Sequence, residues 1–223
     1  MAAKGRTRAE HLGPERRRPH VLDVALRLFR EHGFSGTSME MVAKGAKVTR
    51  PVVYACFPNK RALFRALLDR EERRLLKEIL NRLPDSADSA DPESTLMDGF
   101  TGVLTAASLA PDSWGIMFLS EHGSGEIAAR VESARREVRE RLAELAVPVL
   151  RGRGIKDRDG HLSKLTAHLL MGNAEAGVRL MLSEPEEWTP EELGGWLGRM
   201  TAPALDVLGE IATERSDAVA DAD

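Results

Sequence analysis

The sequence has little cysteine, few aromatic residues and no long apolar run. Cys56 is the only cysteine among 223 residues, which excludes an internal disulfide and a zinc site built on cysteines. Aromatic residues make up 4% of the chain, and helix formers dominate, so an all-β fold is not expected. No stretch approaches ~20 uninterrupted apolar residues, and residues 1–10 lack the apolar core of a signal peptide. We therefore expect a mostly helical, cytoplasmic protein.

Charge is distributed unevenly along the chain. The formal net charge is −3, but residues 1–60 contain 12 Lys and Arg against 5 Asp and Glu. This first segment therefore carries a charge of +7, and the remainder carries −10. A basic head joined to an acidic body is typical of a nucleic-acid-binding unit followed by another module. An ordinary, unevenly charged surface is the alternative explanation.

Capping signals divide the first part of the chain into helices. Apolar residues at helical spacing end at Gly33, which is typical of a helix C-terminus. The segment from Thr37 to Glu40 has the pattern of a capping box, with Thr37 as the N-cap. Thr49 predicts the start of another short helix, and Asn59 predicts the N-cap of a fourth, long helix.

The second half is also expected to be helical. Residues 84–92 are polar and acidic, which predicts a loop between two helices. A helix is expected over about residues 162–182. The pair Thr189 and Glu192 predicts a second capping box at the start of a last helix that runs to about residue 213.

Residues 37–57 have the layout of a helix-turn-helix, in which the second short helix lies in the major groove of DNA. The side chains expected on the outward face of that helix are Thr49, Arg50, Pro51, Val52, Tyr54 and Cys56. An arginine is suited to the O6 and N7 atoms of guanine, and a valine to the thymine methyl group. Two short helices with a tight turn also occur in many helical proteins that bind no DNA.

Residues 20–64 resemble the DNA-binding domain of the TetR family of transcriptional regulators. The strings that carry this resemblance are Ala25–Phe29, Gly33-Phe34, Thr37–Ala43 and Val48–Phe64. The residues that stand in the family's most diagnostic register are Tyr54, Phe57, Lys60, Leu63 and Phe64. A helix-turn-helix alone is a weak signal, whereas this combination is a specific one. The matching segment is about a fifth of the chain.

The resemblance implies an all-α protein with an N-terminal three-helix, helix-turn-helix domain and a C-terminal helical domain for ligand binding and dimerisation. The expected parts are a basic arm (1–17), a DNA-binding domain (18–64), an effector-binding and dimerisation domain (65–213) and an acidic tail (214–223). It also implies a homodimer on a palindromic operator, most often a repressor, that a small and largely apolar molecule releases. The alternative is a DNA-binding regulator, such as an activator, that needs no small-molecule effector.

The resemblance also carries over individual DNA contacts. The residues that would hold phosphates are Thr37 or Ser38, Thr49, Tyr54 and Lys60, and those that would face bases are Arg50, Pro51 and Val52. Two positions depart from the family pattern. Lys47 stands at a turn position that is usually glycine, where a left-handed backbone would cost ~1–2 kcal/mol. Cys56 stands where the family often has histidine or another larger polar residue.

The second half contains candidates for a ligand pocket and a dimer seam. The aromatic, methionine and polar candidates for the pocket are Phe100, Leu104, Trp114, Met117, Phe118, His122, His168, Met171 and Asn173. Rows of this kind are more often plain core, and one sequence does not separate the two. The row proposed for the dimer seam is Leu193, Leu197, Met200, Ala204 and Leu208.

Other features of the sequence are less informative about function. Arginines 16–18 fit either an arm in the minor groove or a solvated tail. The Cys56 thiol fits either a redox sensor or, more often, a small apolar residue. Gly123-Ser124-Gly125 lacks the spacing of a nucleophile elbow, and no histidines stand at metal-ligand spacing. We therefore expect no enzyme, no cofactor and no metal site.

Overall fold

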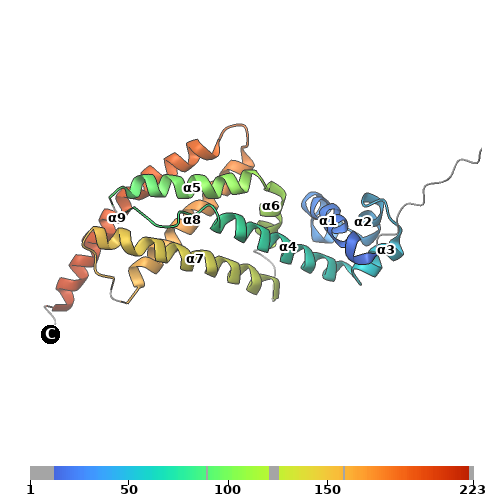
Figure 1. Cartoon of the computed structure of the whole chain (residues 1–223), viewed down its shortest axis with the longest axis horizontal. Helices are drawn as coiled ribbons and strands as arrows, with labels where there is room; N and C mark the ends of the chain where they lie inside the picture. Colours follow the sequence, from blue (N-terminus) through green and yellow to red (C-terminus); the bar gives the residue numbers. More distant parts are fainter. Residues whose placement is uncertain (1–12, 89, 121–125, 158, 221–223) are drawn as a thin grey trace, which may run out of the picture. The chain divides into compact units, whose positions relative to one another are not determined.

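The computed structural model describes residues 13–88, 90–120, 126–157 and 159–220, which form helices and turns without strands (Figure 1). The helices are α1 Pro14–Gly36, α2 Met39–Gly45, α3 Arg50–Cys56, α4 Lys60–Leu80, α5 Pro92–Ser108, α6 Pro111–Ser120, α7 Glu126–Gly152, α8 His161–Ser183 and α9 Pro190–Ala220. The expected all-α class is thus confirmed. Within the described ranges, no helix combines the length and apolar character needed to cross a membrane. Two compact units divide between Glu71 and Glu72, inside α4.

The first unit contains α1, α2, α3 and the beginning of α4. Its core consists of apolar side chains from all four helices, and its largest fully buried members are Val21, Val24, Phe29, Val42, Val53, Phe57, Leu63 and Leu67. The ring of Phe29 lies edge-on to that of Phe64, at a centroid distance of 4.8 Å. Burial of such side chains stabilises a fold by roughly 1.5–3 kcal/mol each, so this core fixes the short helices α2 and α3 against α1.

The capping of α2 differs from the prediction by one residue. Ser38 is the N-cap, and its hydroxyl oxygen accepts a hydrogen bond from the Met41 amide at 3.2 Å. The Thr37 side chain is instead buried, and its hydroxyl lies 3.0 Å from the Leu28 carbonyl and 2.9 Å from that of Gly33. The prediction that Thr37 caps α2 is therefore wrong, because its hydroxyl is directed to the end of α1.

Two other local predictions in this unit are confirmed. Lys47 has a φ of 53°, which places its backbone in the left-handed region that the family pattern fills with glycine. The Asn59 side chain accepts a hydrogen bond from the Ala62 amide at 2.8 Å and so caps α4. Gly33 also has a positive φ, of 69°, and interrupts α1 where the sequence predicts its end.

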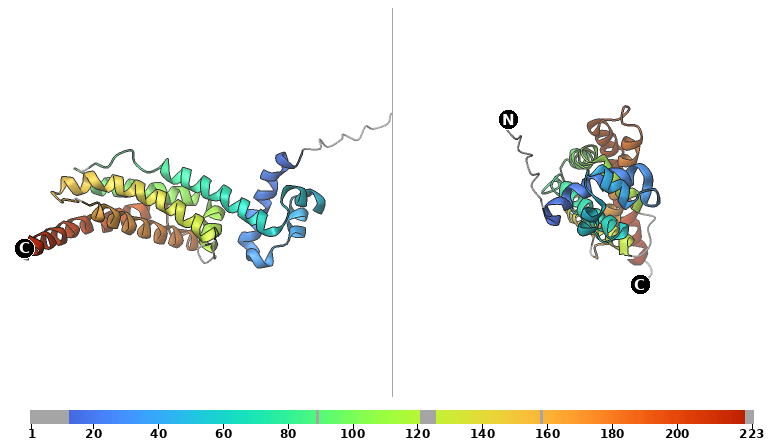
Figure 2. Two further views of the ribbon diagram at one scale, coloured as in Figure 1. Left: turned by 90° about the horizontal axis from the view of Figure 1, so that it is seen from below. Right: turned by 90° about the vertical axis from the view of Figure 1, so that its right-hand side faces the viewer.

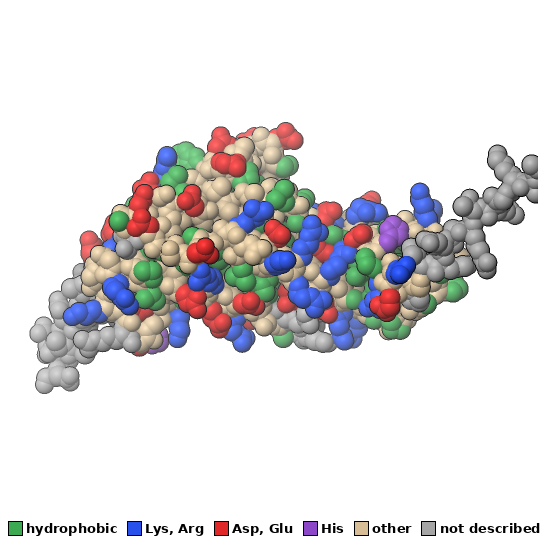
Figure 3. Space-filling model, in the orientation of Figure 1, with side chains coloured by type: hydrophobic (Ala, Val, Ile, Leu, Met, Phe, Trp, Pro, Cys, Tyr) green, Lys and Arg blue, Asp and Glu red, His purple; other side chains and the backbone are tan. Residues whose placement is uncertain are grey.

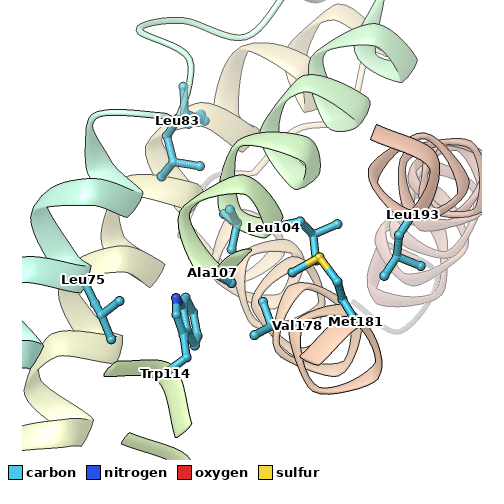
Figure 4. Close-up of a cluster of buried hydrophobic side chains, with 10 residues drawn as sticks. Leu75, Leu83, Leu104, Ala107, Trp114, Val178, Met181 and Leu193 are labelled. Carbon is cyan, nitrogen blue, oxygen red and sulfur yellow. The ribbon is translucent and has the colours of Figure 1, made fainter. Parts of the chain in front are cut away.

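The second unit packs α5 against α9 and α8, and α7 against α8 (Figures 1 and 2). Gly194 and Gly198 allow α9 to approach α5 closely. A Cβ atom at Gly194 would lie 2.7 Å from the Thr101 amide nitrogen, and one at Gly198 would lie 2.7 Å from that of Met97. The core cluster in Figure 4 includes Leu75, Leu83, Leu104, Ala107, Trp114, Val178, Met181 and Leu193.

Several ends of helices in this unit are capped as the sequence predicts. The Thr189 hydroxyl accepts from the Glu192 amide at 3.2 Å, while the Glu192 carboxylate accepts from the Thr189 amide at 3.3 Å. Asp91 accepts from the Ser94 amide at 2.9 Å and ends the predicted loop. The last helix continues to Ala220, beyond its expected end at residue 213.

The apolar row proposed as a dimer seam is divided between core and surface. Leu193 belongs to the core cluster of its own chain, and Leu197 packs partly against it. The inclusion of Leu193 in the seam is therefore wrong, because α9 turns that position toward α5 and α8. The large apolar side chains exposed on α8 and α9 are Leu165, Leu169, Trp196, Met200 and Val207.

Candidate nucleic-acid interface and ligand cavity

The helix α3 separates its residues into a buried and an exposed face. Val53 and Cys56 are buried in the first unit. The residues with exposed or half-buried side chains around the start of the helix are Thr49, Arg50, Pro51, Val52 and Tyr54. Tyr54 keeps 49% of its surface exposed, which leaves its hydroxyl open to a polar partner. These residues agree with the predicted outward face, apart from Cys56.

Cys56 was expected to face outward, and the structure contradicts this. Its side chain is 3% exposed, because it follows Val53 by three residues on the inner face of the helix. Burial raises the pKa of the Cys56 thiol, although the positive charges of Arg18 and Arg17 act in the opposite direction. A buried thiol with a raised pKa is poorly reactive, so the interpretation of Cys56 as a small apolar residue is favoured.

Arg18 stabilises the end of α3. Its guanidinium donates a hydrogen bond to the Cys56 carbonyl at 2.6 Å and lies over the Phe57 ring, 4.3 Å from the centroid. A positive charge at the C-terminus of a helix interacts favourably with the helix dipole. One of the three consecutive arginines expected to belong to a DNA-binding arm therefore supports the protein's own recognition helix. The rest of the predicted arm, as far as residue 12, lies outside the described residues.

Arg50, the first residue of α3, forms an ion pair with Glu40 of α2. Both side chains are exposed, at 57% and 66% respectively. The hydrogen bond from Arg50 and its positive charge lower the pKa of the Glu40 carboxyl. Glu40 is therefore ionised at neutral pH, and the guanidinium of Arg50 is paired with it before any DNA binds.

Lys60, expected to bind phosphate, donates to the protein's own backbone. Its ammonium group lies 2.8 Å from the carbonyl oxygen of Phe34, 3.4 Å from that of Ser35 and 2.9 Å from that of Thr37. It also lies 4.6 Å from the centroid of the Phe34 ring. An ammonium group has three N–H donors, so these carbonyls use its donor capacity. Lys60 thus ties the start of α4 to the corner between α1 and α2.

Of the two hydroxyls considered at that corner, only Ser38 is available to DNA. Thr37 is 2% exposed and its hydroxyl is directed inward. Ser38 is exposed, and its hydroxyl accepts the Met41 amide while its own O–H donor stays available. On the face seen in Figure 3, Lys and Arg side chains are frequent over the helices α1 to α4.

A cavity of about 160 Å³ lies within the second unit. Four of the predicted pocket residues line it: Phe100, Trp114, Met117 and Met171. Figure 4 shows Trp114 near Leu75 of α4 and Ala107 of α5. Most of the other lining side chains are aliphatic, and they include Leu75, Ile79, Val103, Val138, Leu142 and Leu170. The cavity wall is therefore strongly apolar.

The polar part of the cavity wall includes an ion pair between α7 and α8. The Arg135 guanidinium donates to the Glu175 carboxylate at 2.8 Å, and both residues line the cavity. Their side chains are only 26% and 20% exposed. Opposite charges at this distance neutralise each other, so the pair favours an uncharged occupant over an ionised one.

Three predicted pocket residues lie elsewhere. Leu104 is fully buried in the core beside α8 and α9. His168 is exposed, with its Nδ1 atom 2.8 Å from the Lys164 carbonyl oxygen. Asn173 donates to the Thr201 hydroxyl at 3.3 Å. The polar groups of His168 and Asn173 thus have hydrogen-bond partners within the protein, so they do not need a ligand as a partner. His122 and the Phe118 side chain lie outside the described residues.

The cavity residues that sequence reasoning missed come from α4 and α7, and include Leu75, Ile79, Val138 and Leu142. They are aliphatic residues in ordinary amphipathic rows, and Leu75 also belongs to the core cluster, so the sequence does not distinguish the wall of a cavity from core. Among the described residues, no group of His, Cys, Asp and Glu is arranged to hold a metal ion.

Comparison with known proteins places this geometry in a family. Residues 21–67 match the family model described as bacterial regulatory proteins, tetR family. An uncharacterised helix-turn-helix-type transcriptional regulator of Mycobacterium tuberculosis, MT1294, is 30% identical over 174 residues, which cover 74% of this chain and 80% of that protein. The helix-turn-helix-type transcriptional repressor ComR of Escherichia coli is 28% identical over 170 residues, 64% of this chain and 80% of ComR.

A similar fold occurs among solved structures. The crystal structure of a transcriptional regulator from Pseudomonas aeruginosa PAO1 superposes with a TM-score of 0.71 at 22% identity. The superposition covers 90% of this chain and 95% of that chain. The arrangement of helices described above is therefore shared along almost the whole length of both proteins.

Proposed function

The chain belongs to the TetR family of bacterial transcriptional regulators, and we propose that it is a repressor released from its operator by a small, uncharged, apolar molecule. The observation that supports this proposal is that the helix α4 belongs to both units. Its first residues belong to the DNA-binding unit, whereas Leu75, Leu76 and Ile79 line the apolar cavity of the second unit. One continuous helix thus takes part in both functions. The similarity to ComR, a repressor, supports the direction of control.

We assign the DNA contacts to the exposed residues around α3. Arg50, Pro51 and Val52 face the bases, because they occupy the first turn of the recognition helix. Phosphates are held by Ser38, Thr49 and Tyr54, whose hydroxyls are on exposed side chains. Thr37 and Lys60 are removed from the predicted set, because the protein itself uses their polar groups.

The regulator acts as a homodimer that joins through α8 and α9. The helix α8 exposes Leu165 and Leu169, and α9 exposes Trp196, Met200 and Val207. Exposed apolar side chains gathered in this way mark interaction surfaces. A two-fold dimer places two recognition helices about 34–36 Å apart, so that each reads one half of a palindromic operator.

The ligand is defined by the cavity wall. A volume of about 160 Å³ is comparable to an engineered apolar cavity of ~150 Å³ that binds benzene. The pair Arg135–Glu175 carries no net charge, which supports an uncharged ligand over an ionised one. A ligand that empties the operator almost completely must prefer the non-binding state by up to ~5.5 kcal/mol.

The test combines DNA selection with a compound screen on the full-length protein. Bound sequences selected from random DNA yield the operator, and uncharged apolar compounds are then screened for its release. Ala134→Leu, which fills part of the cavity, should abolish release by the best compound and leave operator binding unchanged. Ala129→Leu is the matched control, because Ala129 is exposed on α7.

Each negative outcome has a defined meaning. Failure to select any DNA sequence contradicts the whole proposal. Selection of an operator that no compound releases supports the regulator without a small-molecule effector. Release that Ala134→Leu does not affect places the effector site elsewhere in the chain.

A further inference from the structure

The side of the first unit assigned to DNA includes an acidic residue, Glu40. It is the second residue of α2, and its carboxylate forms an ion pair with Arg50 at the start of α3. Its side chain is 66% exposed, so it is not held there by burial. A carboxylate near the phosphate backbone weakens DNA binding through repulsion unless a cation neutralises it.

Stability of the fold does not explain the pair. Ion pairs between exposed side chains contribute little to folding free energy, and both partners here are more than half exposed. Most side chains in the core of this unit are apolar, and α2 and α3 are held by buried residues such as Val42 and Val53. As an acid in the first turn of α2, Glu40 interacts favourably with the helix dipole, but this does not require Arg50 as its partner. The pair itself is therefore to be explained by the orientation of Arg50.

We propose that Glu40 is a specificity-determining residue, which holds the Arg50 guanidinium in the orientation that reads a base. This inference rests on the proposed function, since it requires Arg50 to face the operator. A guanidinium presents five N–H donors in a rigid plane. Glu40 binds one terminal nitrogen of Arg50, and this leaves donors on the rest of the plane for the two acceptors of guanine.

The geometry explains why a free arginine would discriminate less well. A long side chain at the first position of a helix samples many rotamers, and many of these direct its charge to phosphates, which carry no sequence information. A carboxylate that fixes the guanidinium plane favours the two parallel bonds to O6 and N7. Among the groups that raise the pKa of Arg50, the hydrogen bond and the charge of Glu40 come first, and Tyr54 has a smaller effect.

Glu40 therefore lowers the affinity for DNA in general and raises the discrimination between base pairs. Removal of its charge relieves the repulsion from phosphates, so affinity for DNA of unrelated sequence should rise several-fold at low salt. The same change frees Arg50, so discrimination at the base pair that Arg50 reads should fall. A good bidentate contact discriminates roughly tenfold or more, and we expect most of this factor to be lost.

The experiment measures binding of the full-length protein to the selected operator and to all its single-base variants. Four proteins are compared with the wild type: Glu40→Gln, Arg50→Ala, the double variant and the control Glu31→Gln. Glu31 is an exposed acid of α1 whose carboxylate lies 3.7 Å from the His32 ring. Thermal unfolding of each variant verifies that the fold is intact.

The proposal predicts that Glu40→Gln lowers discrimination at the symmetry-related base pair that Arg50→Ala also affects. It should add nothing to that loss in the double variant, and Glu31→Gln should leave discrimination unchanged. If Arg50→Ala lowers discrimination but Glu40→Gln does not, the inference is wrong and the proposed base contact stands. If Arg50→Ala weakens all sequences equally, Arg50 contacts the backbone, and both the base contact and this inference are overturned.

Discussion

The ammonium group of Lys60 lies 2.9 Å from the carbonyl oxygen of Thr37, twenty-three residues earlier in the chain. Two further carbonyls, of Phe34 and Ser35, accept from the same group. The first residue of α4 therefore holds the end of α1 and the approach to α2. We therefore expect Lys60 to act as a structural residue, whereas its place in the sequence pattern suggests a phosphate contact.

Lys60→Ala should destabilise the DNA-binding unit and leave the salt dependence of operator binding unchanged. Hydrogen bonds from a charged donor contribute about 1.5–3 kcal/mol, and this is the expected loss in unfolding free energy by denaturant titration. A residue that binds phosphate would change the slope of log affinity against log salt by about one unit. Lys44→Ala is the control for the loss of one positive charge from the same unit, since Lys44 is exposed in the last turn of α2. A slope lower by one unit would show that Lys60 binds DNA.

Leu169→Glu and Met200→Glu should convert the proposed dimer to monomers in sedimentation velocity. Both side chains are exposed, at 51% and 71%, and a buried charge at a dimer interface is unfavourable. Leu109→Glu is the matched control, because Leu109 is 66% exposed at the end of α5. An unchanged dimer in both variants would place the interface on another surface.

Leu193→Ala should act differently from these changes. Leu193 is 5% exposed and belongs to the core cluster, so truncation leaves a cavity and should lower the unfolding free energy by about 2–5 kcal/mol. A monomeric but stable variant would return Leu193 to the seam predicted from the sequence.

Asp157→Ala should lower stability at neutral pH but not in acid. Burial raises the pKa of Asp157. Hydrogen bonds from the Ser163 side chain and from the amides of Ser163 and Leu162 lower it by more than burial raises it, so the net shift is downward. A lowered pKa in the folded state stabilises the protein above the ordinary value of 3.8. As pH falls below that value the unfolded chain gains the proton first, and the stabilisation is lost.

The Asp157 carboxylate accepts from the amides of Leu162 and Ser163, in the first turn of α8, at 3.0 and 2.9 Å. Because this is what a capping side chain does, the expected difference between wild type and Asp157→Ala is about 1 kcal/mol at pH 7. It should shrink as pH falls below 3.8 toward the lower pKa of the folded state. Asp98→Ala is the control, because Asp98 is exposed on α5. A difference that is constant down to the acid transition would exclude the ionised cap.

Lys47→Gly should raise the stability of the DNA-binding unit. The φ of 53° at Lys47 costs a residue with a Cβ atom ~1–2 kcal/mol, and glycine adopts it freely. Part of this gain is lost to the greater freedom of glycine in the unfolded chain, so about 1 kcal/mol should remain. Lys44→Gly, within α2, should instead destabilise by a similar amount. Equal losses in both variants would contradict the strain at Lys47.

Local signals in the sequence were sufficient to predict the helices and most of their ends. Asn59 and Thr189 cap helices as predicted, since a cap depends only on neighbours within four residues. The exception is Thr37, where two adjacent hydroxyl residues could each have been the cap. Long-range packing against α1 decided in favour of Ser38, and no local pattern contains that contact.

The candidate site was predictable only in part. The outward positions of Arg50 and Tyr54 follow from the family register, but a helix as short as α3 does not indicate by spacing alone that Cys56 is buried. The partners of Lys60 and Arg18 lie more than twenty residues away in the chain. The cavity is defined by missing contacts between aliphatic side chains, a property of three-dimensional packing that a row of leucines does not reveal.

The exposed Tyr54 on the recognition helix has a spectroscopic consequence. It is the only tyrosine of the chain, whereas all three tryptophans, Trp114, Trp188 and Trp196, belong to the second unit. Protein labelled with fluorotyrosine would therefore show a single fluorine resonance, which reports on the DNA-reading helix alone. Fluorotryptophan labelling would place a second reporter, Trp114, in the wall of the cavity. Because the chain has three tryptophans, a Trp114→Phe variant would assign the resonance from the cavity. Occupancy of the effector cavity and of the operator could then be titrated separately in the wild-type protein.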